Sequence, residues 1–456
     1  MKKRKEKDPM GIVWVSEDRN FGAQTQRSLE NFAIGTEKIP EELITALLLL
    51  KKLAAKVNAK KKLLSPSQGK RIEQAVDTIL RKKDFADFPL TVWQTGSGTH
   101  TNMNVNEVIA HFANASKGKK IHPNDQVNLC QSSNDIMPAA LHVAGFSLVR
   151  SKLLPALKKI TKTLGQKEKA FSSLVKIGRT HMMDAVPLTI GQEFSAFRSQ
   201  LSYDFERIQE SSQELLKLPL GATAVGTGIN SFPTFGKEVC LHLKKVLKAD
   251  FVVSENLFRE LSFKQAVLSL SSELKILATH LFKMANDIRL AASGPRCGLR
   301  EFILPANEPG SSIMPGKVNP TQCEALTMVC LQVMGNDTVI SFANSQGQFQ
   351  LNAYLPVICH NLFQSIHLLA DAMISFDQRC LKELKVDRKI IKKYQENSLM
   401  AATALNRFLG YEKASKIVKK AYQKNQTLQQ AALSEGIKVK EFNKICNLNK
   451  LTKPNL

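Results

Sequence analysis

Apolar residues recur at helical spacing through the middle of this chain. Between residues 137 and 390, three sets step by three or four positions: Leu153, Leu157, Ile160 and Leu164; Phe194, Phe197, Leu201, Phe205 and Ile208; Leu270, Leu274, Leu277, Leu281, Met284 and Ile288. Steps of this size place each set along one face of a helix. The pattern predicts long helices packed as a bundle, and therefore a mainly α fold.

Two further stretches, residues 326–340 and 357–376, are apolar on more than one face. A helix that is apolar all round must be covered on all sides. We therefore expect subunits to pack these helices together in an oligomer.

The length of 456 residues allows two or three domains and a large core. We predict a mixed, mainly helical N-terminal domain over residues 1–136, a central helix bundle over 137–390 and a small helical domain over 391–456.

The formal net charge is +24, a balance that raises nucleic acid or an anionic membrane as a partner. The lysines, however, are scattered along many predicted helices, and no basic stripe interleaves with aromatic residues. No stretch approaches 18 uninterrupted apolar residues. We therefore predict neither a nucleic-acid nor a membrane partner, and a basic surface that steers small dianions inward.

The eight cysteines are dispersed, without a CxxC pair or a metal-ligand spacing. This distribution is typical of reduced, buried thiols in a cytosolic protein. The basic first residues lead into no apolar signal region. We expect a cytoplasmic protein without a metal or redox cofactor.

Residues 310–320 read Gly-Ser-Ser-Ile-Met-Pro-Gly-Lys-Val-Asn-Pro, which predicts an irregular loop. Its lysine and asparagine, Lys317 and Asn319, could hold a carboxylate. A solvated loop between helices would have a similar composition.

Two other motifs place glycines, hydroxyls and amides at predicted helix starts. The first is residues 94–107, with Ser97, Thr99 and Asn102, and the second is residues 131–135, with Ser132, Ser133 and Asn134. Free N–H groups at a helix start bind anions, although an ordinary capping turn would look the same.

Two histidines lie in irregular segments. His181 follows Gly178-Arg179-Thr180, and His122 begins the segment His-Pro-Asn-Asp at 122–125. A lone histidine is more often structural, but one that follows a turn is well placed to act in catalysis.

Together, and in this order, these motifs resemble those of the fumarase/aspartase superfamily, from about residue 8 to the end. Gly316 and residues 94–102 are similar to the class II, iron-independent fumarases, whereas aspartases usually carry alanine at the position of Gly316. The resemblance implies a mainly α, three-domain fold in which a central long-helix bundle builds a tetrameric helical core.

The resemblance also implies roles for individual residues. Ser311 would be the catalytic base, His181 would act on the hydroxyl side through bound water, and Glu324 would hydrogen-bond that histidine. The substrate-binding residues would be Ser97, Thr99, Asn102, Ser132, Ser133, Asn134, Thr180, Ser312, Lys317 and Asn319. A second, non-catalytic carboxylate site would comprise Lys119, His122, Asn124 and Asp125.

The implied activity is fumarate hydratase of the tricarboxylic acid cycle, which reversibly hydrates fumarate to (S)-malate without a metal or cofactor. In this superfamily three subunits of a homotetramer share each active site. The chain departs from the fumarase pattern at His100-Thr101, Ile136-Met137, Met182-Met183 and Phe232.

Two other functions remain open from the sequence. An aspartase or another lyase of the superfamily would share most of the motifs. A catalytically idle, basic scaffold would explain the charge, but it has no need to keep Ser311, His181, Lys317, Asn319 and Glu324 together.

Overall fold

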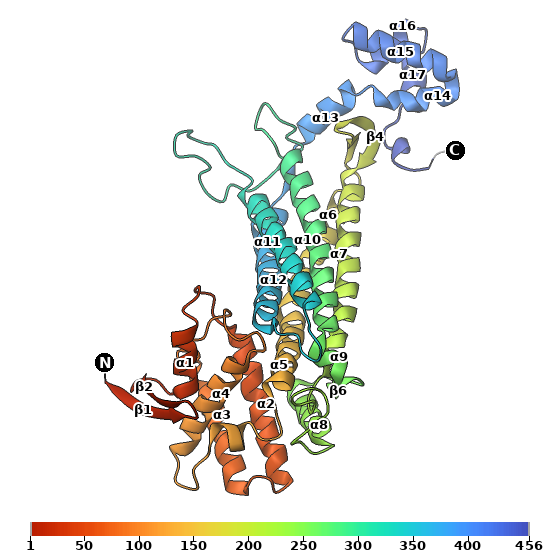
Figure 1. Cartoon of the computed structure of the whole chain (residues 1–456). Coiled ribbons are helices and arrows are strands. Elements are labelled where there is room, and N and C mark those ends of the chain that lie inside the picture. Colours follow the sequence, from red (N-terminus) through yellow and green to blue (C-terminus); the bar gives the residue numbers. More distant parts are fainter. Residues whose placement is uncertain (1, 455–456) are drawn as a thin grey trace. The chain divides into compact units, whose positions relative to one another are not determined.

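The computed structural model describes residues 2–454 and is mainly helical (Figure 1). The chain divides into two compact units. Unit 1 comprises the residues up to Pro155, Glu206–Ala278 and Leu331–Ala370. Unit 2 comprises Ala156–Phe205, Thr279–Cys330 and the residues from Asp371 onward.

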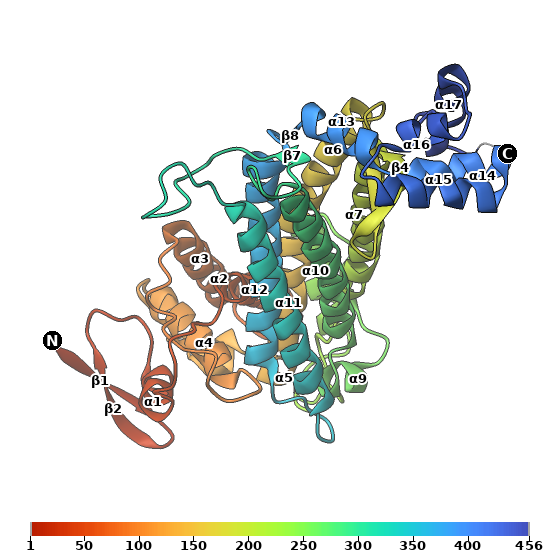
Figure 2. The ribbon, with the colours of Figure 1, turned by 90° about the horizontal axis from the view of Figure 1, so that it is seen from above.

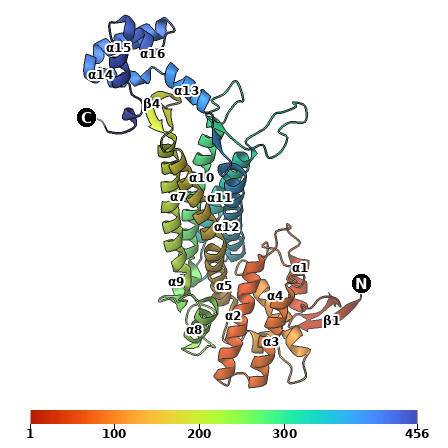
Figure 3. The ribbon, with the colours of Figure 1, turned by 180° about the vertical axis from the view of Figure 1, so that it is seen from behind.

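The first part of unit 1 is a cluster of helices beside a β-hairpin (Figure 3). Its elements are β1 (Lys3–Asp8), β2 (Gly11–Ser16), α1 (Ala23–Asn31), α2 (Glu41–Lys60), α3 (Pro66–Lys82), α4 (Thr99–Asn114), the π-helix η1 (Pro123–Val127), α5 (Ser133–Leu148) and the π-helix η2 (Val149–Leu153). The strands β1 and β2 are antiparallel, and α2 packs against α3 and α5. Ser65 and Gln68 form a capping box at the start of α3, which fixes where that helix begins.

The second part of unit 1 contains short elements. They are the 3₁₀ helix η3 (Glu214–Leu216), β5 (Lys217–Leu218), α8 (Phe235–Leu247), β6 (Val252–Val253) and α9 (Leu257–Ser262). The strands β5 and β6 pair in parallel.

Five long helices occupy the stretches that were predicted to be helical. They are α6 (Leu154–Ala170), α7 (Ile190–Gln213), α10 (Gln265–Ala291), α11 (Thr321–Ser345) and α12 (Leu355–Phe376). The prediction of long helices is confirmed, because the three apolar sets are buried apart from the half-buried Phe205. Each of the last four helices begins in one unit and ends in the other.

Buried polar contacts fix the pairing of these helices. In unit 1, Asp337 of α11 accepts hydrogen bonds from Ser271 at 2.7 Å and Lys275 at 2.5 Å, both on α10. Asn336 of α11 donates to Ser365 of α12 at 3.0 Å, and the two helices lie side by side (Figure 2). A buried polar group needs a partner, so these contacts specify one register of the bundle.

Two segments, Thr321–Ser345 and Leu355–Leu381, are long and apolar enough to cross a membrane by length and composition. Both belong to the helix bundle, which buries part of each. Four apolar side chains of α11 are nevertheless exposed: Met328, Leu331, Val339 and Phe342. We call these residues, together with the exposed Gly335 between them, the α11 stripe.

Unit 2 carries two small antiparallel pairs and the C-terminal helices. The elements are β3 (Val175–Thr180), β4 (Met183–Thr189), β7 (Phe302–Ile303), the π-helix η4 (Asp377–Leu381), β8 (Lys385–Val386), α13 (Arg388–Asn397), the 3₁₀ helix η5 (Met400–Ala402), α14 (Thr403–Leu409), α15 (Tyr411–Gln423), α16 (Leu428–Ser434), α17 (Val439–Ile445) and the 3₁₀ helix η6 (Lys450–Thr452). The strands β3 and β4 pair with each other, as do β7 and β8.

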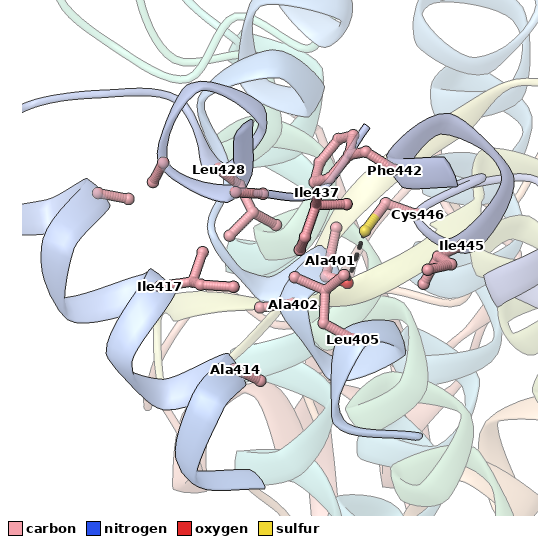
Figure 4. Close-up of a cluster of buried hydrophobic side chains, with 13 residues drawn as sticks. Ala401, Ala402, Leu405, Ala414, Ile417, Leu428, Ile437, Phe442, Ile445 and Cys446 are labelled. Carbon is pink, nitrogen blue, oxygen red and sulfur yellow. Dashed lines mark hydrogen bonds between the residues drawn. The ribbon is translucent and has the colours of Figure 1, made fainter. Parts of the chain in front are cut away.

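The last helices enclose a small apolar core of their own (Figure 4). Leu405, Ile417 and Leu428 meet in it, and the Cys446 thiol donates to the carbonyl oxygen of Ala401 at 3.8 Å. The proposed domain boundaries at residues 136 and 390 stay a prediction.

Candidate active site

The segment from Gly310 to Pro320 forms a closed ring in the long connection between β7 and α11 (Figure 2). The Gly310 N–H donates to the Lys317 carbonyl at 2.7 Å, and the Asn319 amide donates to the Gly310 carbonyl at 2.7 Å. A Cβ at position 310 would lie 2.7 Å from the Lys317 oxygen, so only glycine fits there. The predicted loop is therefore present, and two hydrogen bonds join its ends. We call residues 310–319 the Gly310 ring.

Ser311 lies at the start of this ring and accepts hydrogen bonds from the chain that follows it. Its Oγ receives the N–H of Ile313 at 3.3 Å and of Met314 at 3.1 Å. N–H groups that point at an oxygen favour its negative form. Ser312 and Lys317 are exposed on the same ring.

His181 occupies the tip of a β-hairpin. The strands β3 and β4 pair Thr180 with Met183, so His181 and Met182 form the two-residue turn. Both have positive φ, 56° and 65°, which is the conformation of a type I′ turn. The predicted irregular segment around His181 is therefore a hairpin that exposes the imidazole and the side chain of Thr180.

The sequence analysis missed the carboxylate that anchors this hairpin. Glu301 is completely buried, and it lies 2.9 Å from the Lys176 ammonium and 2.8 Å from the Arg179 guanidinium. Arg179 also lies over the Tyr394 ring at 5.7 Å. Glu301 lies more than 100 residues after the hairpin, so sequence proximity could not predict this contact. The only indication in the sequence was that Lys176 and Arg179 lie on one strand, because two such cations, when buried or partly buried, require an acidic partner.

Glu324 lies in the first turn of α11 and is exposed. Within residues 2–454 of a single chain, no hydrogen bond joins it to His181. The expected pairing of these two residues stays a prediction that concerns contacts between subunits.

The first anion-binding motif lies at the start of α4, as predicted. Gly98 precedes the helix with a positive φ of 71°, and the Ser97 and Thr99 hydroxyls lie 2.7 Å apart. A Cβ at Gly96 would overlap the Ala353 carbonyl at 1.5 Å, so the backbone can approach only because the residue is glycine. Asn102 is buried and donates to Ser133 Oγ at 3.1 Å.

The second motif starts α5, and Asn102 joins it to the first within unit 1. Ser132 caps the helix in a capping box with Asp135, and Asn134 donates to the Ala224 carbonyl at 2.8 Å. Asp135 is completely buried and accepts N–H groups from Ser132, Gly221 and Thr223. Burial raises the pKa of this carboxyl to about 6, despite those hydrogen bonds.

The four residues of the predicted second carboxylate site lie together on the surface. His122 precedes η1, and its Nδ1 accepts the N–H groups of Asn124 at 3.3 Å and Asp125 at 3.4 Å. All four side chains, including that of Lys119, are exposed. Their role stays a prediction.

Three of the four departures from the fumarase pattern make packing contacts, whereas Met182 and Met183 are exposed at the β3–β4 hairpin. The Met137 side chain fills the space beside Gly98, and His100 Nδ1 lies 2.9 Å from the Ser28 hydroxyl. Phe232 packs against Phe235 with ring centroids 5.6 Å apart and under the Lys61 ammonium.

Within residues 2–454, no group of three or more His, Cys, Asp and Glu side chains is arranged to hold a metal ion. Seven of the eight cysteines are buried, and Cys297 is exposed. All eight are free thiols.

Comparison with known proteins identifies the family. Residues 11–335 match the lyase family, and residues 402–453 match the fumarase C C-terminus. The chain is 50% identical over 460 residues to a class II fumarate hydratase of Bacillus anthracis, with 100% of both chains covered. It is 51% identical to one of Thermosynechococcus vestitus, with 97% of this chain and 96% of the relative covered.

The fold agrees with a solved structure of the same kind. The crystal structure of class II fumarase from Schistosoma mansoni superimposes with a TM-score of 0.96 at 39% identity, with 100% of both chains covered. The chain therefore belongs to the class II fumarate hydratases, which are hydro-lyases of the lyase family.

Proposed function

We propose that this chain hydrates fumarate reversibly to (S)-malate, with the Gly310 ring supplying the catalytic base. One observation carries the proposal: Ser311 Oγ accepts two backbone N–H groups, those of Ile313 and Met314. A free serine hydroxyl is far too weak an acid to ionise near neutral pH. Two N–H dipoles, together with the cation Lys317 of the same ring, would stabilise the alkoxide and lower the pKa of the hydroxyl.

In the dehydration direction, the Ser311 alkoxide takes the proton from C3 of malate. The electron pair of that C–H bond moves into the adjacent carboxylate and forms an aci-carboxylate. Lys317 and Asn319 bind this doubly charged group, aided by N–H groups near Ser132 and Ser133. Preorganised donors stabilise such a charge far better than water does.

The electron pair then returns to form the C2–C3 double bond, and the C2–O bond breaks. The departing hydroxide receives a proton from His181 through a bound water and leaves as water. Glu324 of another subunit would set the tautomer of that histidine. Ser97, Thr99, Asn102, Asn134, Thr180 and Ser312 would hold the rest of the dicarboxylate.

We further propose that four copies of the chain assemble and that three of them contribute to each active site. The α11 stripe supports this assembly, because four of its five residues are apolar and exposed in the single chain. The enzyme would be a soluble, cytoplasmic protein of the tricarboxylic acid cycle. Its basic surface would steer dicarboxylates rather than bind nucleic acid or a membrane.

The test is ultraviolet absorbance of fumarate with purified protein and malate. We expect malate-dependent fumarate formation that falls by at least about 1,000-fold in Ser311→Ala, because a base and its stabilising donors act as one unit. Ser434→Ala, a serine on α16 that bonds only the preceding turn, provides the matched control and should retain activity.

Other results would reject the proposal. A protein that consumed fumarate only with ammonium would be an aspartase. A fully active Ser311→Ala variant would exclude Ser311 as the base.

A further inference from the structure

One lysine of α2 is buried without an ionic partner in contact. The Lys51 side chain is completely inaccessible and lies among the apolar residues of the helix, such as Leu47 and Leu48. Lysine is almost never fully buried unless its ammonium group is engaged. Its Nζ donates to Asn128 Oδ1 at 2.8 Å.

Asn128 connects this ammonium to the substrate-binding end of unit 1. Its Oδ1 also receives the side-chain amides of Asn102 at 3.1 Å and Asn106 at 3.3 Å. Its own Nδ2 donates to the Gln131 carbonyl at 3.1 Å, one residue before the cap of α5. We call Lys51, Asn102, Asn106 and Asn128 the Lys51 network.

The network reaches both anion-binding motifs. Asn102 lies in the first turn of α4 and bonds Ser133 Oγ, in the first turn of α5. The Oδ1 atoms of Asn102 and Asn106 are buried without a hydrogen-bond partner. Burying an acceptor without a donor costs free energy. These two amide oxygens can each still accept a hydrogen bond, and they lie beside the proposed substrate-binding motifs.

We infer that Lys51 is a positioning residue: acting through Asn128, its buried ammonium fixes Asn102 and the turn before α5 where the substrate carboxylate binds. This inference rests on the proposed binding roles of Asn102, Ser132 and Ser133. Lys51 itself does not touch the substrate.

Electrostatics support this role. Burial lowers the pKa of Lys51 to about 7, and the carboxylate of Asp135 on α5 partly opposes that shift. Asp135 is the charged group that acts on Lys51 from the neighbouring elements. Below pH about 7 the ammonium is present, and above it the charge is progressively lost, so the hydrogen bond to Asn128 loses its charge-assisted character.

The test compares Lys51→Met with Lys52→Met. Methionine keeps the length of the side chain but removes its charge and donors. Lys52, the adjacent residue, pairs with Asp77 at 2.6 Å near the surface and provides the matched control. We expect Lys51→Met to raise KM for malate by about tenfold with a smaller change in kcat, because one charge-assisted contact is lost.

Stability separates positioning from a purely structural role. Replacing a desolvated ammonium by an apolar side chain of similar volume is often neutral for stability, so we expect Lys51→Met to keep the thermal midpoint of wild type. In wild type, KM should rise as pH increases through about 7, and Lys51→Met should lack that rise. A KM equal to that of Lys52→Met at every pH would overturn the inference.

A second readout needs no substrate. Amide hydrogen exchange in residues 128–135 should be faster in Lys51→Met than in Lys52→Met, because the turn before α5 has lost its anchor. If the unmodified chain had no hydratase activity, the proposed function would fail, and the exchange rates would still decide the role of Lys51. Unchanged exchange would overturn it.

Asn128→Asp covers the case in which Lys51→Met does not fold. It keeps an acceptor for Lys51 but removes the donor to Gln131 and adds a negative charge. We expect a raised KM in this variant as well, and an unchanged KM would count against the network.

Discussion

Single residues with unusual environments concentrate at the start of α5. Asp135 is buried, caps the helix through Ser132 and receives two N–H groups from the segment at 221–223. Burial raises the pKa of this carboxyl despite those hydrogen bonds, so it binds its proton more tightly when folded than when unfolded. Its titration is therefore coupled to folding.

The sign of this coupling gives a prediction. The folded pKa of Asp135, about 6, lies above the ordinary aspartate pKa of 3.8, so the stabilisation is complete below pH about 4. It is lost as pH rises through about 6. The unfolding free energy of wild type relative to Asp135→Asn should fall by on the order of 3 kcal/mol between pH 4 and 7. Urea denaturation of both proteins between about pH 4 and 7 measures this difference in unfolding free energy. A difference that did not change with pH would contradict the prediction.

At the scale of elements, the Gly310 ring and the β3–β4 hairpin each hold one proposed catalytic group by backbone geometry. The hairpin holds His181 in a type I′ turn, and the ring is closed by hydrogen bonds at both ends. Neither geometry depends on a helix or on a large sheet.

Two glycine substitutions in the ring should have different effects. In Gly310→Ala the new Cβ meets the Lys317 carbonyl, so the ring must open. We expect kcat to fall by about 100-fold, as for a misplacement of about 1 Å. In Gly316→Ala the Cβ meets no atom within 4 Å, and the positive φ of 81° is its only strain. A loss below about tenfold is expected there. Equal losses would show that the closure of the ring is unimportant.

Some of these elements and contacts could be predicted from the sequence, and others could not. Periodic apolar residues were sufficient for α7 and α10, because one helix face depends only on local spacing. The four motif segments were also recognised, since glycines and hydroxyls mark turns and helix starts. Glu301 and Lys51 were not found, because their roles arise from burial against segments far away in the chain. The hairpin turn at His181 was missed because Met182 is an unusual residue for positive φ.

For the whole molecule, the exposed α11 stripe is the feature that a single chain does not explain. Its residues Leu331 and Phe342 are 58% and 70% exposed on a helix whose other face is buried in the bundle. An apolar row of this kind is typical of a covered interface.

Leu331→Glu should therefore reduce the assembled mass measured by light scattering and lower activity with it. A charge placed in an apolar interface is desolvated without a partner. Leu241→Glu provides the control, because Leu241 is 61% exposed on α8, away from the α11 stripe. A tetramer that persisted in Leu331→Glu would place the interface elsewhere.

The proposed sharing of active sites between subunits gives a second test. Chains carrying Ser311→Ala and chains carrying His181→Ala would each be inactive alone. Reassembled together, they should regain activity, because some sites would combine the intact serine of one chain with the intact histidine of another. Absence of recovery would mean that both residues act from the same chain.

The two N–H groups that Ser311 accepts come from residues 313 and 314 of the same ring. The proposed base and the dipoles that would stabilise its charge therefore belong to one short piece of backbone. The two donors to Ser311 therefore keep their place beside its Oγ whatever the position of the segment relative to the rest of the subunit. Substrate binding then needs only to position this segment, because the groups that would activate the serine are already in place within it. The pKa of the Ser311 hydroxyl should therefore be insensitive to substitutions elsewhere in the subunit.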